Sequence, residues 1–375
     1  MFQVDITIIG AGVVGLSIAH QLSRDFPEKS ILVLERNSKY GQETSARNSE
    51  VIHSGIYYPR NSLKAKLCLE GRISLYDLCL KNNISFQKIT KIITATKDEA
   101  IPRLESLYQI GIENGVPLEI IDKAQANKLE PNIRCAGGIL SPETGIISVA
   151  ELMDFHYQKA SNNHVDFYFE SQISQINRES NGYKISLLEK DNETSFLSTV
   201  IINSAGLYAD VIAEMAGFKT SHLGYDLSFC KGTYYSLRPA KRGIVTRLIY
   251  PIPPNEGLGV HSVSDIAGTI RFGPDVEYMQ EKKLDYSINE NRKLEFLTAI
   301  QDIIPTIEME DIAADYCGIR PKLQKKGEPF RDFIIKEETE NGFPNFINLI
   351  GIESPGLTAS PAISRMVSEF IGQIF

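Results

Sequence analysis

A glycine-rich turn near the start of the chain constrains its fold more than any other feature. Residues 10–15 read GAGVVG, a G-x-G-x-x-G pattern that is common by chance, so its context decides its meaning. A β-branched apolar run, 4–9, precedes it, and 14–24 follows with helical spacing. A second apolar run, 31–34, ends at Glu35. This βαβ pattern predicts a dinucleotide site with pyrophosphate at the helix N-terminus and Glu35 on a ribose hydroxyl. An ordinary βαβ turn is the alternative.

Length and charge limit the classes of protein to which the chain can belong. At 375 residues the chain is long for one hydrophobic core, so two lobes are expected. Hydrophobic residues make up 42% and charged residues 23%, as in ordinary soluble proteins. The formal net charge of −8 argues against a nucleic-acid partner, which would require a basic face. Small anionic substrates stay open, because a few local cations suffice to bind them.

Cysteine usage and the lack of targeting segments bear on location. The five cysteines are scattered and include no C-x-x-C pair. We therefore expect buried free thiols in a reducing compartment, with no disulfide framework and no metal site. No basic and apolar leader precedes the first predicted strand, and no apolar run approaches the roughly 18 residues of a membrane span. These features predict a cytoplasmic protein without a transmembrane segment, and they leave open a peripheral contact with the inner face of a membrane.

Residue spacing predicts alternating helices and strands along the rest of the chain. Expected helices lie at 62–80, with Ser62 as the N-cap, and at 99–114, 149–160, 292–303 and 360–374. Expected strands lie at 92–96, 140–147, 165–169, 173–177, 183–188, 196–202, 334–336 and 346–349, and the region 224–322 is mostly β. His156 falls within an expected helix, where packing is a commoner role than metal binding. No repeat or low-complexity linker separates these segments, so we expect interleaved domains.

A second turn of small residues follows the expected strand at 196–202. Residues 203–206 read NSAG and lead into a short helix. Small residues at such a turn allow a cofactor to approach the backbone closely. An unremarkable strand–helix turn is the alternative.

The segment 44–71 carries a resemblance to a known family. It reads TSARNSEVIHSGIYYPRNSLKAKLCLEG, and similar motifs recur at 231–235, 248–253, 259–261, 272–275, 318–322 and 351–357. The chain resembles the L-2-hydroxyglutarate dehydrogenase/oxidase family, flavoproteins of the D-amino-acid-oxidase-like superfamily. One departure is Ala46–Arg47, where some members carry Gly-His. The resemblance extends over nearly the whole chain.

The resemblance implies an α/β (α+β) fold. A glutathione-reductase-type, Rossmann-like FAD-binding domain is expected to be interleaved with a mostly antiparallel β substrate domain. The expected ranges are 1–83, 148–220 and 326–375 for the discontinuous FAD-binding domain, and 84–147 and 221–325 for the substrate domain.

The resemblance also implies noncovalent FAD as the cofactor. The glycine-rich loop before the last helix is expected to turn its backbone amides toward the flavin ring. The expected cofactor-binding residues are Gly10, Gly12, Gly15, Glu35, Arg36, Thr44, Ser45, Arg47, Asn48, Ser49, Ile173, Ala205, Gly206, Gly351, Ser354, Gly356, Leu357 and Thr358.

Oxidation of a 2-hydroxy acid requires a group that accepts the hydroxyl proton as hydride leaves carbon-2 for the flavin N5. A neutral imidazole is suited to this role. Each histidine taken alone is more often structural, but within the family pattern we expect His53 to be the base and His261 the second candidate. Neither assignment follows from spacing.

Arginine is the expected partner of the reacting carboxylate, because its planar fork binds a carboxylate through two parallel hydrogen bonds. Arg320 resembles the arginine-before-proline that has this role in D-amino-acid-oxidase-like enzymes, and a surface salt bridge is its alternative. Tyr235 resembles the tyrosine that shares the role, and Tyr58 is a further expected substrate contact. For the distal carboxylate of a five-carbon diacid the candidates are Lys66, Lys231 and Arg47. Lys64 and Lys322 are expected on solvated faces.

These expectations together predict an enzyme that oxidises L-2-hydroxyglutarate, a small dicarboxylate, to 2-oxoglutarate. One alternative is a flavin amine oxidase acting on glycine or a D-amino acid, since one fold supports many reactions. A non-catalytic flavin- or NAD-binding module is the other. The sequence leaves open whether electrons pass to oxygen, a quinone or another carrier.

Overall fold

The computed structural model describes residues 2–189, 192–253 and 257–375. The chain forms two compact units, each built from several segments. The first unit comprises 1–46, 149–229 and 320–375, and the second comprises 47–148 and 230–319. The division of the chain into a cofactor domain and a substrate domain stays a prediction.

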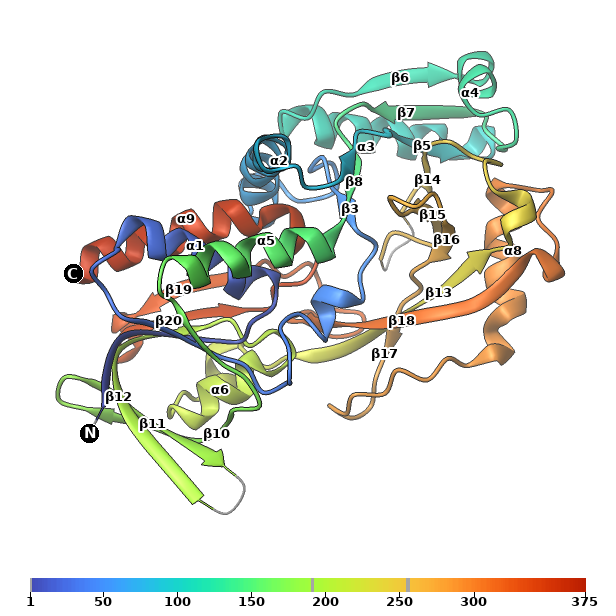
Figure 1. The fold of residues 1–375 in the computed structure, drawn as a ribbon. Helices are drawn as coiled ribbons and strands as arrows, with labels where there is room; N and C mark the ends of the chain where they lie inside the picture. The colour runs from blue at the N-terminus through green and yellow to red at the C-terminus, as the bar shows by residue number, and fades with distance from the viewer. Residues whose placement is uncertain (1, 190–191, 254–256) are drawn as a thin grey trace. The chain divides into compact units, whose positions relative to one another are not determined.

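A parallel sheet forms the centre of the first unit (Figure 1). β1 (Gln3–Ile9) lies between β2 (Ile31–Leu34) and β12 (Asn192–Asn203), β9 (Asp166–Tyr168) extends the sheet beyond β2, and β20 (Phe343–Ile350) pairs with the end of β12. All these pairings are parallel, so the carboxyl ends of the strands lie along one edge. Such strands are buried on both faces, which explains why their sequences are continuously apolar.

Antiparallel strands extend this sheet on the side of β12 that faces away from β1. β10 (Gln172–Glu179) and β11 (Gly182–Glu189) form a hairpin that pairs with the first half of β12. β19 (Ile334–Glu338) pairs with β20. β12 therefore has two roles, because its first half belongs to the hairpin and its second half to the parallel sheet.

Three helices of the first unit pack against one another. α1 (Val13–Asp25) contacts both α5 (Val149–Asn162) and α9 (Gly356–Ile374), and Figure 1 shows the three side by side along the sheet. The shorter α6 (Ala209–Met215) contacts β10 and β20 and is followed by α7 (Thr220–Leu223). The interleaving predicted from the sequence is confirmed in the order of these elements, because α5 and α9 lie far from α1 in the chain.

α9 begins four residues before the predicted position. It starts at Gly356 rather than Ser360, and Pro361 lies inside it. Proline has no N–H to donate to the carbonyl of Leu357. The hydroxyl of Ser360 donates to that carbonyl instead, at 2.9 Å, so the helix tolerates the proline. The predicted start was therefore four residues late, and a proline is common in a first turn but rare further inside a helix, so the sequence did not reveal the earlier start.

The second unit is mostly antiparallel. One sheet contains β5 (Lys91–Ala95), β6 (Glu119–Asp122), β7 (Gly137–Ser141) and β14 (Leu248–Pro251), and its only parallel pair among the described residues is β5–β14. A second sheet contains β13 (Ser228–Leu237), β15 (His261–Ser264), β16 (Ile270–Gly273), β17 (Glu277–Tyr278) and β18 (Ile312–Lys322). A small third sheet joins β3 (Val51–Ile52), β4 (Phe86–Gln87) and β8 (Gly145–Ile147).

The helices of this unit are α2 (Leu63–Asn82), α3 (Ile101–Glu113), α4 (Lys123–Leu129) and α8 (Lys293–Ile303). Ser62 caps α2, as predicted, by accepting a hydrogen bond from the Ala65 N–H at 3.1 Å. α4 and β6 were not predicted. The α/β fold class expected from the sequence is confirmed.

Two further sequence expectations concern thiols and membranes. All five cysteines are buried and free, as expected. In the described part of the chain, no helix is both long enough and apolar enough to cross a bilayer.

Candidate active site

Four of the predicted cofactor-binding turns lie at the same edge of the first unit. Gly10 follows β1, Glu35 follows β2, Gly206 lies just after β12, and Gly351 follows β20. These are neighbouring parallel strands, so their carboxyl ends are adjacent. Ligands of open α/β sheets bind outside this edge. The structure therefore brings together residues that are more than 300 positions apart in the sequence.

Gly10 is required by the fold itself. Its φ is +99°, a conformation that favours glycine, and a Cβ there would lie 2.6 Å from the carbonyl oxygen of Ser204. The turn between β1 and α1 accordingly has no room for a side chain at this position.

Gly12, by contrast, is not required by the protein's own packing. It is the N-cap of α1 with φ −75°, and a Cβ there would meet only Ser45 Oγ, at 3.1 Å. The first turn of α1 carries no acidic residue, and Ser45 Oγ accepts from the Val13 N–H at 3.0 Å. The N-terminus of this helix is thus suited to an anion, and a missing side chain at Gly12 allows close approach. These residues fit the pyrophosphate of a dinucleotide.

The Glu35 carboxylate is fixed by backbone hydrogen bonds. It is 9% exposed, and it accepts from the N–H groups of Ala11 at 2.9 Å and Asn37 at 2.8 Å. A carboxylate has more acceptor positions than these contacts use, so Glu35 retains capacity for a ribose hydroxyl. The next residue, Arg36, pairs with Glu43 and lies 3.8 Å from the centre of the Tyr208 ring.

The other predicted cofactor residues of the first unit differ in how much space surrounds them. A Cβ at Gly206 would meet nothing within 4 Å, whereas one at Gly351 would lie 2.5 Å from Leu323. Gly356 begins α9, whose first turn carries no acidic residue. The remaining predicted residues are Gly15 in α1, Thr44 and Ser45 in a short 3₁₀ turn, Ile173 in β10, Ala205 before Gly206, Ser354 in the loop after β20, and Leu357 and Thr358 in the first turn of α9.

Arg47, Asn48 and Ser49 belong to the second unit. The Arg47 guanidinium lies 4.0 Å from the centre of the Tyr286 ring and donates to the Cys317 carbonyl at 3.4 Å. The carbonyl of Asn48 accepts from the Tyr316 hydroxyl at 2.6 Å. Ser49 is half-buried. The Arg47 side chain is therefore held by residues of the second unit, to which it belongs.

His53 lies in a tightly braced loop after β3. The Arg72 guanidinium donates to the Ser54 carbonyl at 3.1 Å, and the Asn114 amide donates to the Tyr58 carbonyl at 2.8 Å. The Ser54 hydroxyl also bonds to Ser141, at 2.9 Å. The backbone around His53 is consequently held from three sides.

The imidazole of His53 is neutral. It is 8% exposed, and burial together with the charge of Lys91 and the nearby His261 lowers its pKa to about 3. Neutral imidazole is the form that accepts a proton.

His261 has a defined tautomer. Its Nδ1 lies 2.7 Å from the Gly259 carbonyl oxygen, so Nδ1 carries the proton and donates to it. The ring stacks on Tyr250, with 3.7 Å between the centroids.

Lys91 lies with His53 and His261 in one group of interacting side chains, and sequence reasoning missed it. It is 1% exposed, and its Nζ lies 4.5 Å from the centre of the Tyr57 ring and 4.7 Å from that of Tyr250. Burial lowers the pKa of its ammonium to about 7. The one signal in the sequence was a lysine that begins the apolar strand KIITA.

The predicted substrate residues differ in their surroundings. Lys66 is exposed, whereas Lys231 is buried and pairs with Asp285 at 2.9 Å. Tyr235 is buried, and its hydroxyl forms no hydrogen bond with any described residue. Arg320 is half-buried in β18, and Tyr58 is half-buried in the braced loop.

Two lysines contradict the sequence prediction. Lys64 and Lys322 were expected on solvated faces. Lys64 is buried on α2, and Lys322 is largely buried in an ion pair with Glu353 at 3.1 Å. The expectation was wrong because charge alone does not report a partner in a distant segment.

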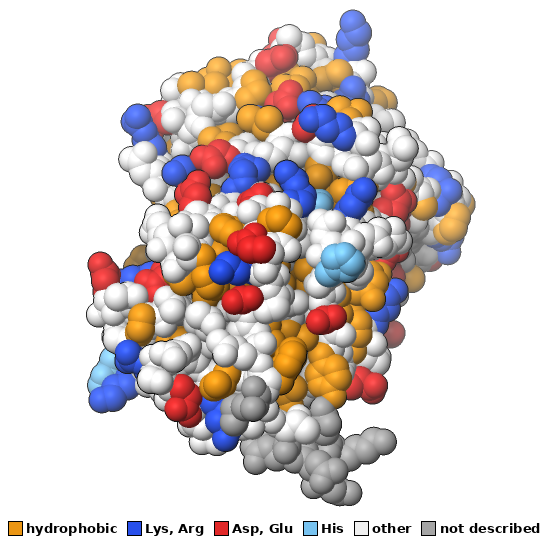
Figure 2. All heavy atoms as spheres, turned by 60° about the vertical axis from the view of Figure 1, so that its left-hand side comes forward, with side chains coloured by type: hydrophobic (Ala, Val, Ile, Leu, Met, Phe, Trp, Pro, Cys, Tyr) orange, Lys and Arg blue, Asp and Glu red, His pale blue; other side chains and the backbone are white. Residues whose placement is uncertain are grey.

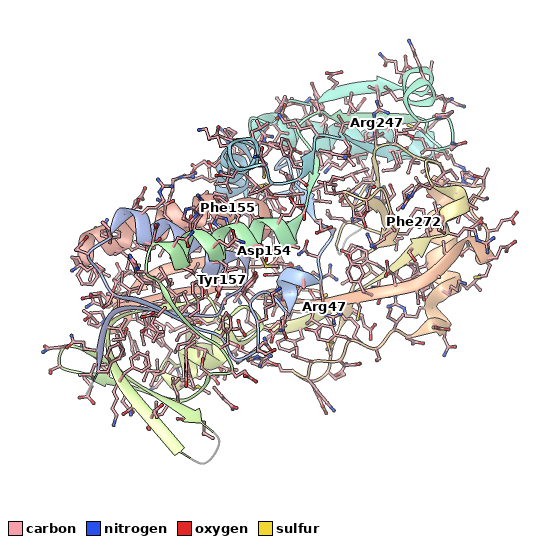
Figure 3. All side chains as sticks on the ribbon, in the orientation of Figure 1. Arg47, Asp154, Phe155, Tyr157, Arg247 and Phe272 are labelled. Atoms are coloured by element: carbon pink, nitrogen blue, oxygen red, sulfur yellow. The ribbon has the colours of Figure 1, made fainter. Side chains whose placement is uncertain are left out.

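His156 is a packing residue, as expected. Its Nδ1 lies 3.0 Å from that of His20, and the His20 ring meets Phe155 edge to face. Figure 3 labels Phe155 on α5. Burial lowers the pKa of His20 to about 4 and that of His156 to about 3, so both are neutral. In the described ranges, no group of three or more His, Cys, Asp or Glu side chains is arranged to hold a metal ion.

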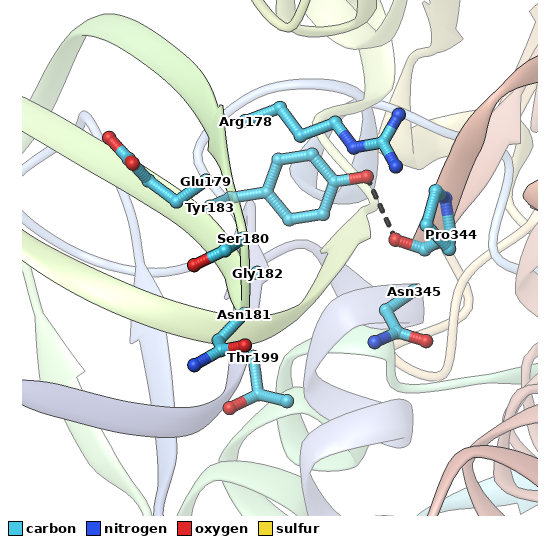
Figure 4. Close-up of a pocket in the computed structure, with 9 residues that line it drawn as sticks. All are labelled: Arg178, Glu179, Ser180, Asn181, Gly182, Tyr183, Thr199, Pro344 and Asn345. Carbon is cyan, nitrogen blue, oxygen red and sulfur yellow. Dashed lines mark hydrogen bonds between the residues drawn. The ribbon is translucent and has the colours of Figure 1, made fainter.

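Surface features elsewhere add no functional residue. A polar pocket of about 350 Å³ lies at the β10–β11 turn of the first unit, with the Tyr183 hydroxyl bonded to the Pro344 carbonyl (Figure 4). It contains none of the predicted site residues. On the face drawn in Figure 2, basic and acidic side chains are interspersed.

Comparison with known proteins shows the family. The model of FAD-dependent oxidoreductases matches residues 5–370. The chain belongs to this family. The prediction of FAD as the cofactor is thereby confirmed, as is the prediction of an oxidoreductase.

Individual relatives cover nearly the whole chain. The mitochondrial L-2-hydroxyglutarate dehydrogenase of Arabidopsis thaliana is 35% identical over 402 residues, which is 98% of this chain and 83% of that protein. The glycerol 3-phosphate dehydrogenase of Caloramator mitchellensis is 30% identical over 99% of this chain and 74% of that protein. The L-α-glycerophosphate oxidase of Mycoplasma pneumoniae, solved with FAD bound, superposes with a TM-score of 0.90 at 25% identity over 99% of this chain and 95% of that chain. The resemblance noted in the sequence is confirmed.

Proposed function

We propose that this FAD-dependent oxidoreductase oxidises L-2-hydroxyglutarate to 2-oxoglutarate. The observation that carries the proposal is the 35% identity to a protein named for that activity, over 98% of this chain. The proposed chemistry requires a cofactor site, a neutral base and a cation for the reacting carboxylate.

When bound, FAD supplies the acceptor for the hydride that leaves carbon-2 of the substrate. Gly10 and Gly12 would leave room for its pyrophosphate at the N-terminus of α1, and Glu35 would accept hydrogen bonds from its ribose. The assignment is supported by the common edge on which these residues lie and by the open approach at Gly12.

His53 is the proposed general base. Its imidazole is neutral and would take the hydroxyl proton of the substrate as the hydride departs. The bracing of its loop supports the proposal, because a base must be held within hydrogen-bond reach of the proton that it removes. His261 is the second candidate, and with its proton on Nδ1 it would accept another at Nε2.

Arg320 is the proposed partner of the carboxylate next to the reacting carbon. Its fork would bind that carboxylate through two parallel hydrogen bonds and orient carbon-2. Tyr235 is proposed as a further substrate contact, supported by a buried hydroxyl that no described residue satisfies.

Oxidation of L-α-glycerophosphate is a second candidate function. It is supported by the names of the Caloramator relative and of the Mycoplasma structure. Both candidate substrates are secondary alcohols that carry an anionic group, so the same base would serve either reaction.

Anaerobic reduction of the purified holoenzyme separates these possibilities. The flavin absorbance near ~450 nm is followed after addition of L-2-hydroxyglutarate, D-2-hydroxyglutarate, L-α-glycerophosphate, glycine or D-alanine. We expect rapid bleaching with L-2-hydroxyglutarate alone. Bleaching by L-α-glycerophosphate, or by an amino acid, with no response to L-2-hydroxyglutarate would overturn the proposal.

The electron acceptor and the location are proposed separately from the reaction. We propose a cytoplasmic protein that passes electrons to a quinone or another carrier, which fits the dehydrogenase names of its relatives. Turnover with a soluble quinone analogue that exceeds turnover with oxygen is the expected result, and the reverse would make the enzyme an oxidase.

A further inference from the structure

Lys91 is a buried lysine with no acidic partner among the residues that the structure describes. It is 1% exposed, and none of the residues that the structure describes forms an ion pair with it. Lysine is almost never fully buried unless it is paired. An anion is therefore the component that this environment lacks.

Among the described residues, the surroundings of Lys91 offer hydrogen-bond donors, and no Asp or Glu contributes to the shift of its pKa. Its Nζ lies over the rings of both Tyr57 and Tyr250. Both phenol hydroxyls are buried and form no hydrogen bond with a described residue, and burial raises the pKa of both well above its usual value. They stay protonated at neutral pH and are therefore able to donate to an anion. The titratable groups linked electrostatically to Lys91, His53 and these two tyrosines further include Tyr58, Cys68, Tyr234 and His261.

Of the three cations that we expected at the distal carboxylate, two contact other side chains and the third is exposed. Lys231 is paired with Asp285, the Arg47 guanidinium lies on the Tyr286 ring, and Lys66 is exposed. Lys91 acts electrostatically on His53, the proposed base, so the two side chains are close. In a five-carbon diacid the two carboxylates are separated by three carbons, which places the distal one within the reach of groups around the base.

We propose that Lys91, with the hydroxyls of Tyr57 and Tyr250, binds the distal carboxylate of the diacid substrate. This inference rests on the proposed function and deepens it, because it names the residues that select a dicarboxylate over a monocarboxylate. A buried ammonium flanked by two phenol donors matches a carboxylate, which offers about four acceptor positions.

The test compares two substrates of equal length. L-2-Hydroxyglutarate and L-2-hydroxypentanoate differ only in that the second has a methyl group where the first has its distal carboxylate. In Lys91→Met, kcat/KM for L-2-hydroxyglutarate should fall about 100-fold, while kcat/KM for L-2-hydroxypentanoate should change less than about threefold. Equal losses with both substrates, or no loss with either, would overturn the proposal.

Lys88→Met is the matched control. Lys88 lies three residues before Lys91, also has its Nζ 4.5 Å from a tyrosine ring, that of Tyr76, and pairs with Glu143 at 3.1 Å. Its replacement should leave the ratio of the two kcat/KM values unchanged. A change in the ratio as large as that of Lys91→Met would contradict a specific role for Lys91.

A binding measurement tests the same proposal without requiring turnover. The oxidised holoenzyme is titrated with 2-oxoglutarate and with 2-oxopentanoate, and the change in flavin absorbance gives each Kd. Lys91→Met should weaken only 2-oxoglutarate. Tyr250→Phe removes one hydroxyl and keeps the ring, so it should give the same pattern with a loss of roughly tenfold even if Lys91→Met does not fold.

These measurements also separate the inference from the proposed function. If the wild-type flavin is not reduced by L-2-hydroxyglutarate, the proposed function fails, and the relative Kd values of the diacid and the monoacid still test Lys91. If the wild type is reduced but the variants keep the preference for the diacid, only the inference fails.

Discussion

Replacing Gly12 and Gly10 by alanine should separate the demands of the cofactor from those of the fold. The two glycines are two residues apart in one turn, yet their surroundings differ. A Cβ at Gly12 would meet only Ser45 Oγ, at 3.1 Å, and its φ of −75° suits alanine. A Cβ at Gly10 would lie 2.6 Å from a backbone oxygen, at a φ of +99°.

These differences set the expected magnitudes. Gly12→Ala replaces a tolerated N-cap by a poor one, so the free energy of unfolding of the apoprotein should fall by only about 0.5–1 kcal/mol. The new methyl group would occupy the approach of the pyrophosphate. Loss of one hydrogen bond to a charged group, about 1.5–3 kcal/mol, and local overpacking, about 1–3 kcal/mol, together predict FAD affinity at least ~100-fold weaker. Gly10→Ala combines backbone strain with overlap and should destabilise even the apoprotein by about 3 kcal/mol or more.

Two measurements on each variant are sufficient. Thermal unfolding of the apoprotein reports the fold, and titration with FAD, followed by quenching of flavin fluorescence, reports the cofactor site. We expect Gly12→Ala to lower Tm by no more than about 3 °C and to lose FAD, and Gly10→Ala to lower both strongly. If Gly12→Ala binds FAD within threefold of the wild type, the cofactor does not approach this helix N-terminus and the reasoning is refuted.

Three further outcomes follow from the chemistry of the side chains. His53→Ala should slow anaerobic flavin reduction about 10²–10⁴-fold with FAD content unchanged, and a normal rate, with the loss found in His261→Ala instead, would reverse their roles. Arg320→Ala should lower kcat/KM by the equivalent of about 3–5 kcal/mol, with poor rescue by Arg320→Lys because an ammonium lacks the planar fork, and near-normal kinetics would disprove the assignment. His20 and His156 have folded-state pKa values of about 4 and 3, below the ordinary 6.5, so their contribution to stability is complete above pH 6.5 and is lost as pH falls. Between pH 7 and pH 5 the wild type should lose on the order of 2 kcal/mol more stability than His156→Phe, which lacks one of the two histidines, and an identical pH dependence in that variant would contradict the neutral pair.

The parallel sheet of the first unit was predictable because its signals are local. A buried parallel strand is apolar throughout, and a turn that approaches a ligand requires small residues, so β1, Gly10 and Glu35 are visible within the first 35 positions. The cap of α2 at Ser62 was predictable for the same reason.

The parts that failed depend on contacts between distant segments. Lys91 is one cation in a strand, and nothing near it in the sequence reveals that Tyr57 and Tyr250 close around it. Lys322 looked solvated because Glu353, its partner, lies 31 residues away. Such side chains acquire their chemistry only from the tertiary structure, which is why sequence reasoning selected the wrong lysines as solvated.

The parallel sheet has a consequence for the order in which the protein matures during translation. Its edge carries Gly10 and Gly351, so the second glycine leaves the ribosome more than 300 residues after the first. β20 and α9 together supply the final neighbour of β12 and the helix that packs on α1. A nascent chain therefore has a nucleotide-binding turn long before it has the edge to which that turn belongs. The finished edge is accordingly available to the flavin only after β20 and α9 have been synthesised.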